Sequence, residues 1–218
     1  MADNIYLNLW FPTFTAGEML PRALTVLRQF PFSKERPGVG YMAVRSLSWS
    51  EPLVSEQTFD ERTDPEHALR LAGEFLHDDN AYEFETAWDL WAPGEQYDTW
   101  AEEPHPVLFI VHGTQFEDGV YREDGHIQVD FGPDTPFLYE DLELTEIGQQ
   151  RVQANLQKLV NFTVAGEKSC GISGRVLWSE SEENLAQKLI ERLQRCNDFS
   201  TQRRGDAEKD WWVQECVT

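Results

Sequence analysis

The sequence predicts an α+β fold, with a mixed, largely antiparallel sheet of about seven strands and about four helices packed mainly on one face. The central observation is the segment 105–133. It holds an apolar run, Val107–Val111, then two Asp-Gly pairs, then alternating apolar residues at Ile127, Val129 and Phe131. This pattern is typical of a long β-hairpin whose first strand is buried on both faces. The other strand-like segments often follow one another without a helix between them, which favours α+β over a parallel sheet.

The N-terminal part alternates strands with one helix. Strands are predicted over 5–11, 41–49 and, as an edge strand after a proline, 53–59. Thr15 and Glu18 have the spacing of a capping box, which predicts a helix directly after them. Pro21 lies one turn further on, so we expect the regular part of that helix to begin there.

The remaining elements follow from apolar periodicity. Asp64-Pro65 predicts the start of a second helix, and apolar residues of one parity predict a strand over 82–90. The C-terminal half predicts helices over 145–160 and 182–193, a loop over 166–174 and a short strand over 175–178. Residues 1–196 are assigned to one α+β domain, or to two βα-containing halves that share one sheet. Residues 197–218 are assigned to a polar tail, which we expect to be mobile unless Trp211 and Trp212 anchor it.

The net charge of −21 is concentrated in the middle of the chain. Residues 51–103 carry 16 acidic and two basic side chains (−14), and residues 104–146 carry ten and one (−9). A region of this charge repels nucleic acid and anionic membranes and attracts basic partners. The alternative is that these acids keep an aromatic-rich protein in solution.

The cysteine pattern and the termini indicate a cytoplasmic protein without a cofactor. Cys170, Cys196 and Cys216 are odd in number and far apart, which excludes a disulfide framework and a zinc pattern. The start of the chain lacks the features of a signal peptide, and no apolar run is long enough to span a membrane. Phosphate-binding glycine motifs are absent. We therefore predict no metal, no cofactor, no nucleic acid and no membrane contact, and the sequence leaves the oligomeric state open.

His112, His126 and Asp130 are the candidates for a catalytic or metal-binding cluster. If the hairpin closes near residue 121, His112 faces Asp130 across the two strands, and a carboxylate can orient an imidazole for base catalysis or metal binding. The alternative is a hydrogen-bonded structural pair. The two Asp-Gly pairs also allow other registers, so the sequence does not fix which residues meet.

An apolar strand that ends in Val111-His112-Gly113 resembles the oxyanion-side strand of the α/β-hydrolase family. The resemblance implies a nucleophile elbow of the form G-x-S-x-G between a strand and a helix. The nearest sequence, Cys170–Arg175, lacks the second glycine at the required place and precedes a predicted strand. No histidine follows Ser173, so the order of the catalytic partners does not match either.

A second set of candidates combines paired acids and aromatic residues in the acidic middle of the chain. The acids are predicted to bind a basic partner, and the tryptophans could also serve sugar or cation recognition. The candidates are Asp78, Asp79, Trp91, Trp100, Glu102 and Glu103. The alternatives are that the acids are simply solvated and that the tryptophans cover the edge of the sheet.

Taken together, the sequence favours a non-catalytic, acidic, cytoplasmic binding protein for a basic protein partner. Toxin-neutralising immunity proteins and nucleic-acid mimics are comparable in charge, and the comparison rests on charge alone. A small hydrolase-like or metal-assisted enzyme that uses His112 with a nearby carboxylate is the first alternative. A structural or assembly subunit without a ligand is the second.

Overall fold

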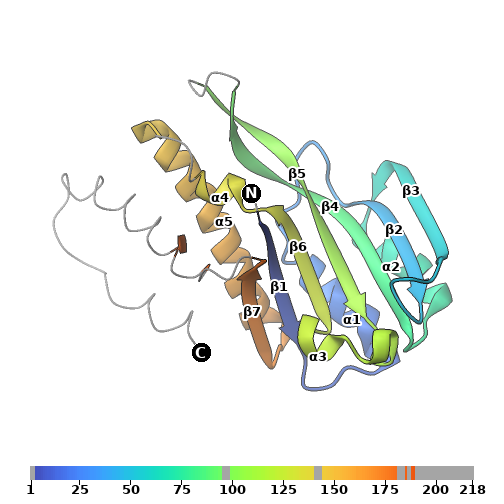
Figure 1. Cartoon of the computed structure of the whole chain (residues 1–218). Coiled ribbons are helices and arrows are strands. Elements are labelled where there is room, and N and C mark those ends of the chain that lie inside the picture. The colour runs from blue at the N-terminus through green and yellow to red at the C-terminus, as the bar shows by residue number, and fades with distance from the viewer. Residues whose placement is uncertain (1–2, 95–98, 140–143, 181–184, 186–187, 190–218) are drawn as a thin grey trace.

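A computed structural model of the chain describes residues 3–94, 99–139 and 144–180, together with Leu185, Lys188 and Leu189 (Figure 1). Seven strands form one antiparallel sheet in the order β3-β2-β4-β5-β6-β1-β7. The strands are β1 Asn4–Trp10, β2 Val39–Ser46, β3 Leu53–Thr63, β4 Asn80–Pro93, β5 Trp100–His112, β6 Ile127–Pro133 and β7 Gly174–Ser179. The predicted α+β class is confirmed, and β5 lies in the middle of the sheet as expected for the first strand of the hairpin.

Three long helices and several short ones accompany the sheet. They are α1 Ala16–Leu27, α2 Pro65–Ala72, α3 Tyr121–Asp124, α4 Thr135–Leu138 and α5 Glu146–Cys170, with 3₁₀ turns η1 Gly73–Phe75 and η2 Phe116–Asp118. The predicted helices at α1, α2 and α5 are confirmed, whereas the short α3 and α4 are not foreseen by periodicity. The predicted helix over 182–193 lies largely outside the described residues, and the predicted tail over 197–218 lies wholly outside them.

Two predicted helix boundaries are wrong. Helix α1 begins at Ala16, because the carboxylate of Glu18 accepts the backbone N–H of Thr15 at 3.0 Å and caps the first turn. From there the helix continues through Pro21 without a break. Near the C-terminal end of α5, the expected loop is helical as far as Cys170. The helix stops there because Gly171 adopts a left-handed conformation with φ 65°.

The two faces of the sheet differ in what covers them. On one face, α1, α2 and α5 pack over buried apolar side chains such as Leu7, Phe109, Val129 and Trp88. Figure 1 views the sheet from the opposite face, in front of which only the short segment around α3 crosses the lower ends of the strands. We call this second face the open face. Ile110 points to it from β5 and is nevertheless only 9% exposed.

Candidate protein-binding surface

Three loops meet at one end of the sheet, and we call residues 47–52, 74–79 and 113–126 the loop end. They connect β2 to β3, α2 to β4 and β5 to β6. The backbone N–H of Leu47 donates to the carbonyl oxygen of Asp79 at 2.8 Å, and that of Glu117 donates to the carbonyl oxygen of Leu47 at 2.8 Å. The N–H of Gln115 donates to the carbonyl oxygen of Asp78 at 2.7 Å. The loops are therefore held as one surface by their backbones.

The loop end also holds unusual backbone conformations. Leu47, Glu117 and Asp118 have positive φ values of 68°, 47° and 54°. A residue with a Cβ atom pays roughly 1–2 kcal/mol for this left-handed conformation. Strain of this kind persists where the surroundings enforce it, and it gathers at functional sites.

Trp49 is the aromatic side chain at the centre of this surface. Its backbone N–H donates to the carboxylate of Glu117 at 2.7 Å. Its indole ring stands edge-on to Phe116 and His112, with centroid distances of 5.0 and 6.0 Å, while the Arg45 guanidinium lies 5.8 Å from the ring centroid. The side chain is held on three sides and still 38% exposed, which suits it to act as an anchor for a partner.

Further large apolar side chains are exposed around this end. Leu47 is 58% exposed, Leu76 is 40% exposed and Val54, the second residue of β3, is 50% exposed. Leu76 and Val54 line one shallow hollow of about 400 Å³, together with Glu74 and Asp79. The described residues include six exposed large hydrophobic side chains. Four of the six lie around this end, namely Leu47, Trp49, Val54 and Leu76. Such a gathering marks an interaction surface more often than scattered apolar residues do.

Carboxylates surround these apolar side chains. The loop end carries eight of them, at Glu51, Glu74, Asp78, Asp79, Glu117, Asp118, Glu123 and Asp124, against a single Arg or Lys, Arg122. Within the part of the chain that the structure describes, none of the eight pairs with Arg or Lys, and the pairs that form are those of Asp78 and Asp79 with His77. The carboxylates that do pair with Arg or Lys lie on helices or within strands, at Glu18, Glu66, Glu83, Glu85, Glu102 and Glu167.

His112 directly precedes the last segment of the loop end, His126 is the final residue of that segment, and both side chains are buried. The Nδ1 atom of His112 lies 2.8 Å from the carbonyl oxygen of Gly125, and its ring is 1% exposed. The Nδ1 atom of His126 accepts the backbone N–H of Phe11 at 3.0 Å, and its ring is stacked against Tyr121. Burial lowers the pKa of both rings, that of His126 to about 4, so both are neutral at pH 7.

The expected pairing of His112 with Asp130 is wrong. Leu108 lies opposite Asp130, and His112 lies opposite His126, whose carbonyl oxygen accepts the His112 backbone N–H at 2.9 Å. The midpoint of the connection lies near residue 119 and not near residue 121, because η2 and α3 fill the loop in place of a tight turn, so the residue opposite Asp130 is shifted by four positions along β5. Four strand residues put about 13 Å between the two side chains. Asp130 instead accepts the N–H of Gly132 at 2.8 Å.

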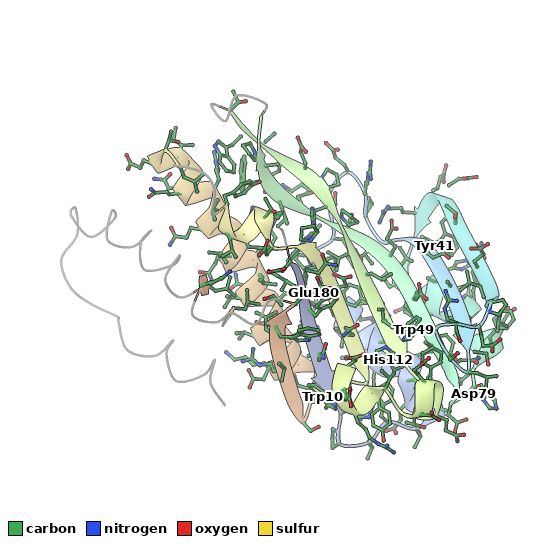
Figure 2. The ribbon with its side chains drawn as sticks, in the orientation of Figure 1. Trp10, Tyr41, Trp49, Asp79, His112 and Glu180 are labelled. Carbon is green, nitrogen blue, oxygen red and sulfur yellow. The ribbon has the colours of Figure 1, made fainter. Side chains whose placement is uncertain are left out.

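The six predicted binding residues separate into two groups. Asp78 and Asp79 belong to the loop end, near which Figure 2 labels Asp79, Trp49 and His112. The other four lie toward the far tip of the β4–β5 hairpin, where Trp91 pairs with Glu102. The two groups are roughly 35 Å apart at strand rise, so they do not form one face.

At the hairpin tip, most of the predicted side chains already have partners within the chain. The Arg151 guanidinium of α5 lies 3.6 Å from the ring centroid of Trp91, and Trp100 stands edge-on to Tyr139. The Glu102 carboxylate pairs with Lys34 at 3.4 Å and with Lys158 at 3.9 Å. Glu103 is exposed. The loop end is therefore the stronger candidate for contact with another molecule.

The described residues hold neither a candidate metal site nor a candidate membrane-spanning helix. No group of three or more His, Cys, Asp or Glu side chains in them is placed to hold a metal ion. No helix in the same residues is long and apolar enough to cross a lipid bilayer. Comparison of the chain with family models, curated proteins and solved structures found no match.

Sequence reasoning overlooked the residues that define the loop end, namely Leu47, Trp49 and Glu117. Leu47 and Trp49 continue the alternation of β2 and are expected to extend that strand to residue 49, but β2 ends at Ser46. A leucine gives no signal for positive φ, which usually belongs to glycine, asparagine or aspartate. The available signals were the two Asp-Gly pairs, which correctly mark turns, because Gly119 and Gly125 have φ values of 86° and 84°.

Proposed function

We propose that this protein is a non-catalytic binding protein and that its loop end binds a basic protein partner, as an immunity protein or a protein inhibitor does. The carrying observation is that Leu47 and Trp49 are exposed among eight carboxylates that have no Arg or Lys partner in the described chain. Apolar and aromatic anchors inside a polar rim are the usual anatomy of a protein interface.

Electrostatics favours a cationic partner. The chain has a net charge of −21, and the loop end adds a local excess of carboxylates to this overall field. Such a field raises the rate of encounter with a positively charged protein. Salt weakens the effect, with a screening length of about 8 Å at physiological ionic strength.

The contacts of His112 favour a supporting role over the catalytic alternative. Its ring is enclosed by Trp49, Phe116 and the Gly125 carbonyl group, and no carboxylate oxygen lies opposite it in the register. His112 lines neither of two hollows among the described residues, namely the one that includes Tyr41 and Arg62 and the one that includes Leu76. His112 therefore fits best as a buried residue that packs against Trp49 and supports it.

A pull-down with two matched charge variants tests the proposal. The loop-end variant is Glu51→Lys/Glu123→Lys, and the control variant is Asp60→Lys/Glu103→Lys. All four side chains are exposed and form no hydrogen bond or ion pair within the described chain, so both variants change the net charge equally without breaking a contact. Cell extract from the source organism is passed over each bait at low and at high salt.

The proposal predicts that wild type and the control variant retain the same basic protein at low salt, and that the loop-end variant does not. Retention that both variants lose equally would mean that only the net charge matters. Retention that neither variant loses would place the interface elsewhere. Either of these results would overturn the proposal.

A further inference from the structure

One row of side chains crosses the open face of the sheet at right angles to the strands. The registers of β1, β6, β5, β4 and β2 align five residues in it, and we call these the face row: Tyr6, Asp130, Leu108, Glu85 and Tyr41. All five are partly exposed. The order is aromatic, acidic, apolar, acidic, aromatic, so the row is chemically symmetric about Leu108.

The two carboxylates of the face row differ in how they are neutralised. Asp130 has no Arg or Lys partner among the described residues and accepts only the N–H of Gly132. Glu85 pairs with Arg62 at 3.5 Å, and its side chain is still 45% exposed. On the neighbouring positions, Glu83 is 3.8 Å from Arg45, and Glu56 accepts the Tyr41 hydroxyl at 3.2 Å. The centre of the open face is therefore acidic overall.

The spacing of the face row matches the surface of an α-helix. Neighbouring strands are about 4.8 Å apart, so Asp130 and Glu85 are separated by about 10 Å, with Leu108 halfway between them. On an α-helix, residues i and i+7 lie about 10.5 Å apart on one face, and i+3 or i+4 lies between them. The tyrosines at the two ends are about 19 Å apart, which corresponds to about 13 helical residues.

An extended segment fits this row less well. Side chains on one face of a β-strand repeat about every 6.7 Å, which exceeds the strand spacing by about 2 Å at each step. The pitch of an α-helix is 5.4 Å and exceeds it by only about 0.6 Å. Two aromatic end groups and a central apolar contact also supply the anchors that a helix needs when it docks by one face.

We propose that the face row binds an amphipathic, basic α-helix of the partner that lies across the strands. Lys or Arg at positions i and i+7 of that helix meets Asp130 and Glu85, and an apolar side chain at i+3 or i+4 packs on Leu108. Tyr6 and Tyr41 bound the two ends and contact the helix with their rings. This docking mode rests on the proposed function, because it requires the partner to be basic, and it adds which element of the partner binds and where.

Two synthetic helical peptides of about 18 residues with identical composition provide the test. The matched peptide carries Arg at i and i+7 and Leu at i+3 and i+4 in an alanine-rich, end-capped sequence. The control peptide carries its second Arg at i+5, which places that side chain about 140° around the helix from the first Arg. Affinities for the full-length protein are measured by fluorescence anisotropy at low salt, with helicity checked by circular dichroism.

The proposal predicts that the matched peptide binds saturably and at least about tenfold more tightly than the control peptide. The variant Asp130→Asn keeps an acceptor for the Gly132 N–H and should weaken the matched peptide about tenfold, with an unchanged melting temperature. The loop-end variant Glu51→Lys/Glu123→Lys should bind the peptide like wild type. Equal affinity for the two peptides, or an unchanged affinity of Asp130→Asn, would overturn the proposal.

The two proposals fail in different ways. If the partner is lost from the loop-end variant while both peptides bind equally, the loop end stands as the binding surface and the face row does not. If the matched peptide binds with the predicted dependence on Asp130 while the loop-end variant retains its partner, the face row stands and the loop end does not.

Discussion

The backbone N–H of Glu117 donates to the carbonyl oxygen of Leu47 at 2.8 Å, and both residues have positive φ. The bond joins the β2–β3 loop to the β5–β6 loop at the point where each is strained. Each of the two residues adopts an unfavourable backbone conformation, which lowers the stability of the fold. The hydrogen bond between them fixes the position of one loop relative to the other. Leu47 and Trp49 both lie in the β2–β3 loop that this bond holds, and both side chains are exposed.

Replacement of Leu47 separates its backbone strain from its exposed side chain. Leu47→Gly and Leu47→Ala both remove the apolar side chain, but only glycine adopts φ 68° without a steric penalty. We expect the free energy of unfolding of Leu47→Gly to exceed that of Leu47→Ala by about 1 kcal/mol, and both variants to bind the partner more weakly than wild type. Urea titration measures the difference in stability, and an alanine variant as stable as the glycine variant would show that the strain is absent.

Gly113 allows the loops of the loop end to approach each other closely. A Cβ atom at this position would lie 2.4 Å from the carbonyl oxygen of Asp78 and 2.6 Å from that of Asn80. Gly113→Ala should therefore lower the free energy of unfolding by about 2 kcal/mol or more. Gly17→Ala is the matched control, because its Cβ atom meets nothing within 4 Å and alanine favours the helix. Thermal unfolding should separate the two variants in opposite directions from wild type.

His112→Ala tests whether this ring supports the surface. The change leaves a cavity beneath Trp49 and removes the contact with the Gly125 carbonyl oxygen, so we expect a loss of about 3 kcal/mol of stability. The fluorescence of Trp49 should shift when the neighbouring His112 ring is removed. The Trp49→Phe variant is measured in parallel, because the other tryptophans also contribute to the signal. An unchanged melting temperature combined with a lost catalytic turnover would instead revive the enzyme alternative.

Acid should destabilise the folded protein through the buried imidazoles. The pKa of His126 is about 4 in the folded state because burial disfavours the charged ring, whereas an unperturbed histidine titrates near 6.5. Between these values the unfolded chain binds more protons, so the free energy of unfolding decreases as the pH falls, by roughly 1 kcal/mol per pH unit for this ring. His112 acts in the same direction.

Unfolding in urea at pH 7 and pH 5 measures this dependence. The His126→Asn variant keeps a polar acceptor near the Phe11 N–H and should show a flatter pH profile than wild type. Burial raises the pKa of Glu83 and Asp130, which opposes the trend in the more acidic range, so the comparison stays at or above pH 5. Parallel profiles for wild type and His126→Asn would contradict the assignment.

Most of the sheet could be predicted from the sequence because burial imposes a period of two. Tyr82, Phe84, Trp88 and Leu90 share one parity and are all buried in β4, and Val107, Phe109 and Val111 are buried in β5. The start of α2 could be predicted as well, since the Asp64 carboxylate accepts the N–H of Glu66 at 2.8 Å. These signals can be read from short stretches of sequence, and the strand residues concerned pack into one hydrophobic core.

The register of the central hairpin and the place of the candidate site could not be predicted. Both Asp-Gly pairs turn the chain, with φ of 86° at Gly119 and 84° at Gly125, so two turn signals compete and neither forms a two-residue hairpin. The face row depends on the registers of five strands at once. A count of charges along the chain likewise cannot tell that Asp79 and Glu102 lie at opposite ends of the same hairpin.

The central claim is that the loop end binds a basic protein partner, and association kinetics test it most directly. The rate of association of the captured partner is measured by stopped flow for wild type, Glu51→Lys/Glu123→Lys and Asp60→Lys/Glu103→Lys over a series of salt concentrations. We predict that the loop-end variant associates about tenfold more slowly than the control variant at low salt, with a flatter dependence on salt. Equal rates and equal salt slopes for the two variants would contradict the claim.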